Sequence, residues 1–282
     1  MTNNQEALWV ERYRPQTIED CIIPARVKTD LREYVEQGSF PSQLYCGTPG
    51  TGKTTVAKAL CNELDADFIM INGSDESGIS TIRNKVKNFA STISLMSEAS
   101  HKVVIFDEAD YLEPKSQGAL RGMIEEFHEN CRFIFTCNFR NKMIEPIQSR
   151  CSVVDFNEFP QKEIDQIKVQ FLKRFVSILD ENEIDYDKKV LAQFINLHFP
   201  DFRRMINELQ RYSMSGKIDE YILRSASNDA INEIVEFLRN KNFRVMREWV
   251  DQNTSLDIHA VIDRLFDALM PVLRDNSVPE MI

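Results

Sequence analysis

One short segment runs from an apolar stretch through a glycine-rich turn: Leu44-Tyr45-Cys46-Gly47-Thr48-Pro49-Gly50-Thr51-Gly52-Lys53-Thr54. Its last eight residues fit the pattern G-x-x-x-x-G-K-[ST]. Apolar side chains then recur at helical spacing, at Val56, Leu60 and Leu64. Glycines in such a turn let backbone N–H groups surround phosphate oxygens, and a following helix directs its positive end at the same anion. The segment therefore predicts a strand, a phosphate-binding loop and a helix, with an ordinary glycine-rich turn as the alternative.

Four further apolar runs predict strands, at residues 68–71, 103–106, 133–136 and 153–156. Helical stripes lie between them, for example Ile79, Ile82, Val86 and Phe89. Alternating strands and helices favour a parallel sheet with helices on both faces. The predicted fold class is therefore α/β, with five parallel strands.

The pattern changes after Pro160. Strand patterns are absent beyond this residue, and three helices are predicted at 161–180, 187–198 and 202–213, with three more from about 229 to 274. A joint is expected at 213–219, which contains Gly216. We expect an α/β domain over residues 1–158, a small helical domain over 159–226 and a helical region over 227–282.

The composition excludes several classes of protein. Of the 282 residues, 43% are apolar, 34 are Lys or Arg and 44 are Asp or Glu, so the net charge is −10. This balance excludes a disordered chain and a wholly basic nucleic-acid coat, although a local basic stripe on an acidic protein remains possible. The longest apolar runs fall far short of the about 20 residues of a membrane-spanning helix. We expect no membrane partner and a location in the cytoplasm.

The six cysteines, at positions 21, 46, 61, 131, 137 and 151, include no Cys-x-x-Cys pair. They predict neither a zinc site nor a disulfide framework, but small buried thiols in a reducing compartment.

Two acidic residues, Asp107 and Glu108, directly follow the predicted strand at 103–106. Together with the glycine-rich loop they predict a nucleotide-hydrolysing site. Lys53 is expected to reach the β- and γ-phosphates, and the Thr54 hydroxyl and Asp107 to hold Mg²⁺. Glu108 is expected to polarise the attacking water. A surface acidic turn is the alternative interpretation.

Several longer motifs resemble those of AAA+ ATPases, and in particular sliding-clamp loader small subunits. They are Asp107-Glu108-Ala109-Asp110, Trp9-Val10-Glu11-Arg12-Tyr13-Arg14-Pro15, Ser149-Arg150-Cys151, Asn72-Gly73-Ser74-Asp75, Ser116-Gln117-Gly118-Ala119-Leu120-Arg121 and Pro200-Asp201-Phe202-Arg203-Arg204. The resemblance extends from about Leu8 to Tyr212. The resemblance is strongest to the small loader subunit of large tailed phages, and replication factor C small subunits are the second choice.

The resemblance implies ATP and Mg²⁺ as cofactors and assigns residues to them. The adenine would lie against Val10, Glu11, Arg12, Tyr13 and Ile22, and the phosphates against Gly50, Thr51, Gly52, Lys53, Thr54 and Thr55. Asn138 would position the attacking water, and Arg203, in the helical lid, would reach the γ-phosphate. Arg150 would act in trans on the nucleotide of a neighbouring subunit. For Arg121 and Arg204, a catalytic role and a plain surface charge are both open.

The resemblance also implies partners: primer–template DNA, a ring-shaped sliding clamp and other loader subunits in a pentameric assembly. DNA phosphates would meet the helix that starts near Ser77, Gly78 and Ile79 and carries Arg83, while Lys85 and Lys87 are equally well explained as a solvated face. The clamp would meet Ile93, Leu95 and Met96, for which burial in the chain's own core is the alternative.

The implied function is that of an ATP-hydrolysing subunit that opens the clamp and loads it onto DNA. The helical region 227–282 corresponds to a collar, and the resemblance leaves open whether that collar is incomplete in this chain or supplied by another chain. The alternatives are another AAA+ DNA-dependent ATPase, such as a helicase loader or a branch-migration motor, and a non-catalytic scaffold subunit. The Ser-Arg-Cys motif opposes the former, and the intact Lys53, Asp107, Glu108 and Arg150 oppose the latter.

Overall fold

The computed structural model describes residues 8–75, 78–92, 101–214, 216–224, 237–238, 242–252 and 265. The chain divides into two compact units. The first comprises Met1–Ser177 and His198–Arg211, and the second comprises Ile178–Leu197 and Tyr212–Ile282. Within the described ranges, no helix is long and apolar enough to cross a membrane.

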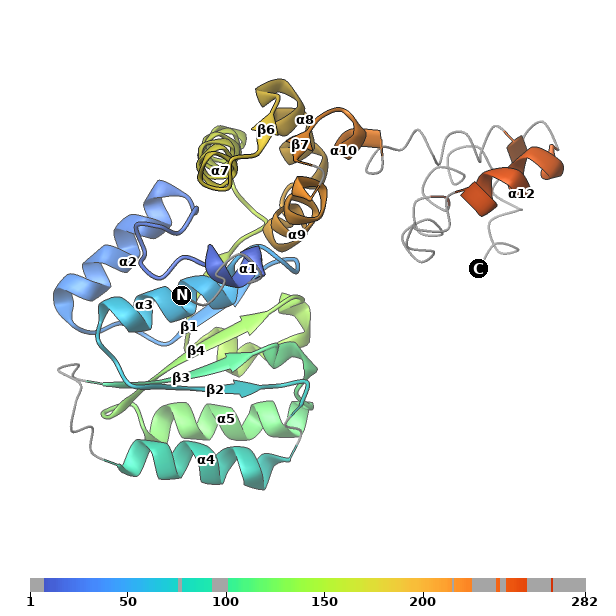
Figure 1. Ribbon diagram of the computed structural model, residues 1–282. Coiled ribbons are helices and arrows are strands. Elements are labelled where there is room, and N and C mark those ends of the chain that lie inside the picture. The colour runs from blue at the N-terminus through green and yellow to red at the C-terminus, as the bar shows by residue number, and fades with distance from the viewer. Residues whose placement is uncertain are drawn as a thin grey trace, which may run out of the picture. The chain divides into compact units, whose positions relative to one another are not determined.

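The first unit is built on a sheet of five parallel strands, which confirms the predicted fold class (Figure 1). The strands are β1 (Gln43–Cys46), β2 (Phe68–Asn72), β3 (Lys102–Asp107), β4 (Cys131–Cys137) and β5 (Ser152–Asp155). Their order is β2-β3-β4-β1-β5, so β1 lies between β4 and β5. The glycine-rich loop that leaves β1 therefore starts at the carboxyl edge of the sheet, beside the ends of β3 and β4, where ligands bind in such sheets.

Helices cover both faces of this sheet. Figure 1 shows α2 (Ala25–Gln37) and α3 (Lys53–Glu63) on one face, and α4 (Ile79–Ser91) and α5 (Pro114–Glu126) on the other. The inner strands are accordingly apolar and buried almost throughout. On the α4–α5 face, Phe106 stacks on Phe133 and Phe135, with ring centroids 6.5 and 5.3 Å apart. The edge strand β2 instead leaves Phe68 and Met70 partly exposed.

The first unit also contains several shorter elements. They are α1 (Trp9–Arg12), the 3₁₀ turns η1 (Ala109–Tyr111) and η2 (Arg140–Lys142), and α6 (Glu145–Gln148).

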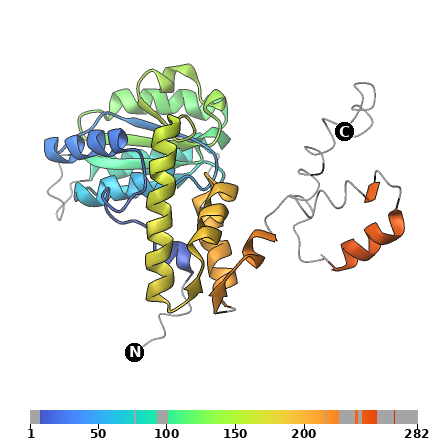
Figure 2. The same ribbon diagram turned by 90° about the horizontal axis from the view of Figure 1, so that it is seen from above.

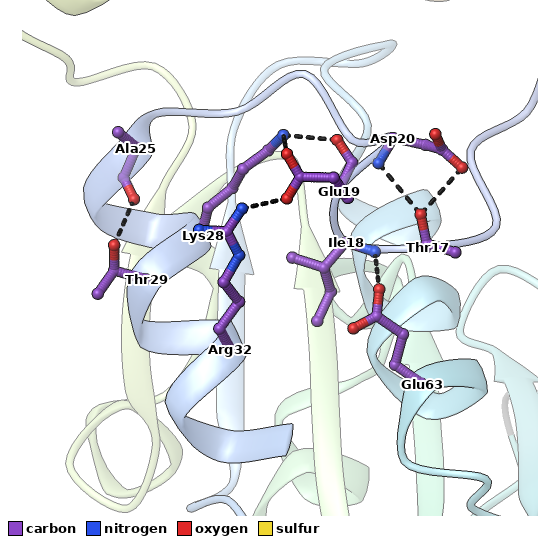
Figure 3. Close-up of polar contacts among 9 residues, drawn as sticks. All are labelled: Thr17, Ile18, Glu19, Asp20, Ala25, Lys28, Thr29, Arg32 and Glu63. Atoms are coloured by element: carbon purple, nitrogen blue, oxygen red, sulfur yellow. Dashed lines mark hydrogen bonds and ion pairs between the residues drawn. The ribbon is translucent and has the colours of Figure 1, made fainter. Parts of the chain in front are cut away.

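The loop between α1 and α2 is tied to both helices beneath it (Figure 3). The buried Ile18 donates its backbone N–H to Glu63 Oε1 of α3 at 2.6 Å. From α2, Lys28 donates to the carbonyl of Glu19 at 2.6 Å, and Arg32 pairs with the Glu19 carboxylate. The hydrogen bond from Arg32 lowers the pKa of Glu19. These contacts fix the path of the N-terminal segment over the α2–α3 face.

Two longer helices, α7 (Gln161–Glu181) and α9 (Phe202–Ser213), lie mostly in the first unit, α7 as far as Ser177 and α9 as far as Arg211. They lie side by side in Figure 2, and the rings of Phe171 and Phe202 stack with centroids 3.8 Å apart. The peptide bond between Phe199 and Pro200 is cis.

The second unit contains α10 (Tyr221–Arg224), α12 (Phe243–Gln252) and all of α8 (Lys188–His198) except its last residue. It also contains a parallel pair of two-residue strands, β6 (Asp185–Tyr186) and β7 (Lys217–Ile218). The prediction that no strand follows Pro160 is therefore wrong, because a two-residue strand is too short to produce a periodic pattern. Apart from α12 and a few single residues, the helices predicted between 229 and 274 lie outside the described residues.

Candidate functional site

The glycine-rich loop joins the end of β1 to the start of α3 at Lys53. Gly52, the residue before the helix, has φ +92°, a left-handed conformation that side chains disfavour. Gly50 has φ +78° and lies under the start of α9. A Cβ at Gly50 would be 1.9 Å from Asp201 Oδ1, and the Gly50 carbonyl accepts a hydrogen bond from Phe202 N–H at 3.0 Å. Glycine is thus required at position 50 by the close approach of α9 as well as by the turn.

The Lys53 ammonium lies inside the loop. It donates to the carbonyls of Gly47 and Thr48 at 2.6 and 2.9 Å, and to Asn138 Oδ1 at 3.0 Å. Burial lowers the pKa of Lys53, while Asp107 and Asp110 act against that shift. The structure brings Lys53 and Asn138 into direct contact, although they are far apart in sequence. A phosphate entering the loop would exchange its own oxygens for these carbonyl and amide partners.

The Asp107 carboxylate, at the end of β3, accepts hydrogen bonds from two hydroxyl groups. Thr54 Oγ1 donates to Asp107 Oδ1 at 2.7 Å, and Thr136 Oγ1 donates to the same oxygen at 2.5 Å. Thr136 also accepts a hydrogen bond from Glu108 N–H at 3.1 Å. Glu108 itself has φ +54°, which is uncommon for a residue with a side chain. The Thr136 hydroxyl therefore holds the Asp107 carboxylate and the Glu108 backbone.

Thr136 is absent from the predicted site. Its only sequence signal is a hydroxyl residue at the end of an otherwise apolar strand, which also fits a strand terminus.

The donor set around Asp107 suits Mg²⁺. It consists of hard oxygen atoms, and among the described residues no group of three or more His, Cys, Asp or Glu side chains forms a closed metal cage. Mg²⁺ is commonly bound in this way, by one or two protein oxygens with water and phosphate oxygens in the remaining positions. Thr54 and Asp107 are the residues that would hold it.

A cavity of about 250 Å³ opens over these groups. Arg203 of α9 lines it together with the loop, Asp107, Glu108 and Asn138. Its other walls include Val10, Arg14, Lys58, Met70 and Ile206. Of these, only Val10 belongs to the predicted nucleotide-binding residues. Arg14 lies in the same N-terminal motif without a predicted role, and Lys58, Met70 and Ile206 lie outside the quoted motifs.

The other predicted adenine contacts occupy different positions. Ile22 lines a second, smaller apolar cavity, which also includes Thr51 and Phe202. Glu11 pairs with Arg14 at 2.8 Å, and the Arg12 guanidinium lies 5.0 Å from the centroid of the Tyr13 ring.

The N-terminal helix α1 is attached to the helix that carries Arg203. Trp9, which is buried, donates its backbone N–H to Gln210 Oε1 of α9 at 2.9 Å. From α7, Arg174 donates to the Tyr13 carbonyl at 3.2 Å. The wall of the cavity that contains Val10 is therefore linked to the wall that contains Arg203.

Arg150 lies at the opposite edge of the sheet from the cavity. It precedes β5, whose first residue Ser152 pairs in register with Gln43, the first residue of β1. Arg150 donates to Glu125 Oε1 of α5 at 2.8 and 2.5 Å and to the Pro146 carbonyl at 2.9 Å. This pairing lowers the pKa of Glu125. Arg150 is not among the residues that line the cavity of its own chain.

The predicted DNA-binding residues that the structure describes lie around α4. Gly78 precedes its first residue, Ile79, which is 37% exposed. Arg83 is exposed and lies 3.5 Å from Glu126 of α5. Ser77, and the predicted clamp-binding residues Ile93, Leu95 and Met96, lie outside the described residues.

Comparison with known proteins gives two family matches. Residues 43–158 match the ATPase family associated with various cellular activities (AAA). Residues 163–224 match the family described as sliding-clamp-loader large subunit, AAA+ ATPase lid domain. Among solved structures, a Holliday junction branch migration motor, RuvB of Thermotoga maritima, superposes with a TM-score of 0.59 over 80% of each chain. At 17% identity, this likeness shows a shared fold only.

Several relatives are similar along most of their length. The sliding-clamp-loader large subunit of Escherichia phage RB69 is 35% identical over 95% of this chain and 86% of its own. That of Enterobacteria phage T4 is 38% identical over 87% of this chain and 77% of its own. The replication factor C small subunit of Saccharolobus solfataricus is 38% identical over 87% of this chain and 71% of its own. The resemblance drawn from the motifs is confirmed: this chain belongs to the AAA+ family of sliding-clamp-loader and replication factor C subunits.

Proposed function

We propose that this chain is an ATP-hydrolysing subunit of a sliding-clamp loader, which opens the ring-shaped processivity clamp and places it on primer–template DNA. One observation carries the ATPase part of the proposal. The glycine-rich loop, Asp107, Glu108 and Arg203 all line the same cavity, in a chain of the clamp-loader family.

Within the cavity, each group has a distinct role. The loop N–H groups and Lys53 bind the phosphates, and Lys53 exchanges its present carbonyl partners for phosphate oxygens. Thr54 and Asp107 hold Mg²⁺, which neutralises phosphate charge when bound. Glu108 accepts a proton from the attacking water, and Asn138 orients that water through its amide. Arg203 brings positive charge to the γ-phosphate from α9.

The position of Arg150 supports a shared active site. Because it lies at the amino edge of the sheet and the cavity at the carboxyl edge, Arg150 reaches a γ-phosphate only in a neighbouring subunit. Glu125 holds Arg150 within the isolated chain, and assembly would exchange this carboxylate for the neighbour's phosphate. We propose a pentameric assembly of several copies with one different subunit, acting in the cytoplasm of the cell in which the DNA is replicated.

The DNA and clamp surfaces are further parts of the proposal. Gly78, Ile79 and Arg83 would meet DNA phosphates without reading bases. Ile93, Leu95 and Met96 would contact the clamp.

The test is ATP hydrolysis by the purified chain, alone and with its companion subunit, measured with and without primed DNA and candidate sliding clamps. We expect the highest rate when DNA and clamp are both present, and no activity from the matched Lys53→Ala protein. Stimulation by branched DNA but not by any clamp would favour a branch-migration motor. Nucleotide binding without turnover under every condition would indicate a scaffold subunit.

A further inference from the structure

Two cysteines face each other where β1 and β4 end. Cys46 and Cys137 are the last residues of these neighbouring parallel strands and pair in register. Their Sγ atoms are 3.4 Å apart, and both residues are buried, at 1% and 0% exposure. In-register residues of adjacent strands are separated by about 4.8 Å, which lies within the Cα–Cα range of disulfides. The two thiols therefore need only a small movement to become bonded.

This pair differs from the other cysteines of the chain. Burial raises the pKa of Cys21, Cys61 and Cys151 to about 12 and that of Cys131 to about 11. Cys46 is shifted in the opposite direction, because the Cys137 thiol donates a hydrogen bond to Cys46 Sγ. Arg140 and Lys53 lower the pKa of Cys46 further, while burial and Asp155 act against the shift. The same hydrogen bond, followed by burial, raises the pKa of Cys137. The hydrogen bond therefore distinguishes the two sulfurs, because Cys137 donates it and Cys46 accepts it.

The pair lies directly under the phosphate-binding loop. Gly47, the residue after Cys46, donates its N–H to the Cys137 carbonyl at 3.2 Å. Asn138, the residue after Cys137, accepts a hydrogen bond from Lys53 at 3.0 Å. The Gly47 carbonyl accepts another from the same ammonium at 2.6 Å. A shift of the backbone at either cysteine would therefore reach Lys53 through a single residue on each strand.

We propose that Cys46 and Cys137 form an oxidisable dithiol site, which a hydroperoxide converts to a disulfide, and that the disulfide form binds nucleotide more weakly. The second clause rests on the proposed function of the loop; the first does not. The sequence alone predicts only buried structural thiols, because the two residues are far apart in the chain and no Cys-x-x-Cys spacing marks them.

The reaction balances with hydrogen peroxide as oxidant. The Cys46 sulfur attacks one peroxide oxygen, the O–O bond breaks, and the departing hydroxide takes the proton of the Cys46 thiol to form water. The resulting Cys46 sulfenic acid is attacked by the Cys137 sulfur. The S–S bond forms, the S–O bond breaks, and the departing hydroxide takes the Cys137 proton as the second water. The two sulfurs together lose two electrons, and the peroxide gains them.

The expected effect on nucleotide binding follows from the bond length. The S–S bond measures about 2.05 Å, so the sulfurs must approach from 3.4 Å. We expect this movement to draw the ends of β1 and β4 together and to shift Gly47 and Asn138, two of the three residues that accept hydrogen bonds from Lys53. Because the thiols are buried, we expect the reaction to be slower than that of an exposed thiol, and to require local opening that admits a molecule close to water in size.

The experiment begins with the full-length reduced chain, treated with hydrogen peroxide and then with catalase. Free thiols are blocked with N-ethylmaleimide in denaturant, and the digest is mapped by mass spectrometry before and after dithiothreitol. We expect a peptide pair linked through Cys46 and Cys137 that dithiothreitol separates. Recovery of both residues as maleimide adducts, or a link between any other pair, would overturn the proposal.

Nucleotide affinity is then measured by titration with a fluorescent ATP analogue. We expect several-fold weaker binding after oxidation and full recovery with dithiothreitol. Cys137→Ala should be insensitive to peroxide, whereas Cys131→Ala, a buried cysteine of the same strand, should respond as the wild type does. If Cys137→Ala does not fold, Cys46→Ala replaces it as the variant that cannot form the disulfide. If peroxide lowers the nucleotide affinity of Cys137→Ala as much as that of the wild type, the disulfide is not the cause of the weaker binding. A disulfide form that binds nucleotide with unchanged affinity would overturn the same link. If the reduced wild type fails to bind the analogue, the proposed function fails, and the peptide map still tests the dithiol site.

Discussion

Replacing Thr136 by Val removes a hydroxyl but preserves the shape of the side chain. In the structure this hydroxyl is 2.5 Å from Asp107 Oδ1, to which it donates, and 3.1 Å from Glu108 N, from which it accepts. Thr136 is 2% exposed, so water does not readily replace it. A hydrogen bond to a charged group contributes about 1.5–3 kcal/mol, and a buried N–H left without a partner costs about 1–3 kcal/mol. Because the two bonds share one hydroxyl and are not additive, we expect a loss of about 2–4 kcal/mol in the free energy of unfolding.

The loss is measured by urea unfolding, with Thr136→Ser as the matched control. Serine keeps the hydroxyl and loses only a methyl group, so we expect it to lie much closer to wild type than valine does. We also expect Thr136→Val to slow ATP hydrolysis, because Asp107 and the Glu108 backbone lose a shared anchor. An unfolding free energy within about 0.5 kcal/mol of wild type for the valine variant would show that the two hydrogen bonds do not hold the site, and would refute this reasoning.

Three further predictions concern the proposed function. Glu108→Gln should retain Mg·ATP binding and lose hydrolysis, since an amide does not take a proton from water; turnover at the wild-type rate in a phosphate-release assay would place the base elsewhere. Arg150→Ala should lower the stimulated ATPase rate by a factor of about 10³–10⁵, the contribution of arginine fingers in GTPases. Mixing Arg150→Ala with Lys53→Ala subunits should restore part of the activity, because some interfaces then pair an intact loop with an intact Arg150. No recovery of ATPase activity in the mixture would contradict a shared site. Arg83→Gln should weaken DNA binding about equally for all sequences and reduce the slope of log affinity against log salt by about one, whereas a sequence-dependent loss in fluorescence anisotropy would contradict backbone contact.

Much of the fold follows from local patterns in the chain. The glycine-rich loop, the apolar strands and the helical stripes are each encoded within a few consecutive residues, so their periods can be read directly. Chain order alone also places the loop at the carboxyl edge of a parallel sheet and Arg150 before its last strand. These are properties of spacing and require no knowledge of which side chains meet.

The contacts that assemble the site join residues that are far apart in the chain. Thr136 reaches Asp107, and Cys46 meets Cys137, only because the strand order places β4 between β3 and β1. Nothing in the chain near either residue marks it for that role. The N–H of Trp9 bonds to Gln210 for the same reason: the partners are 201 residues apart, and packing rather than periodicity brings them together. Side chains from distant segments become neighbours only when the sheet and its covering helices close around a common core, so these contacts are decided by the tertiary structure.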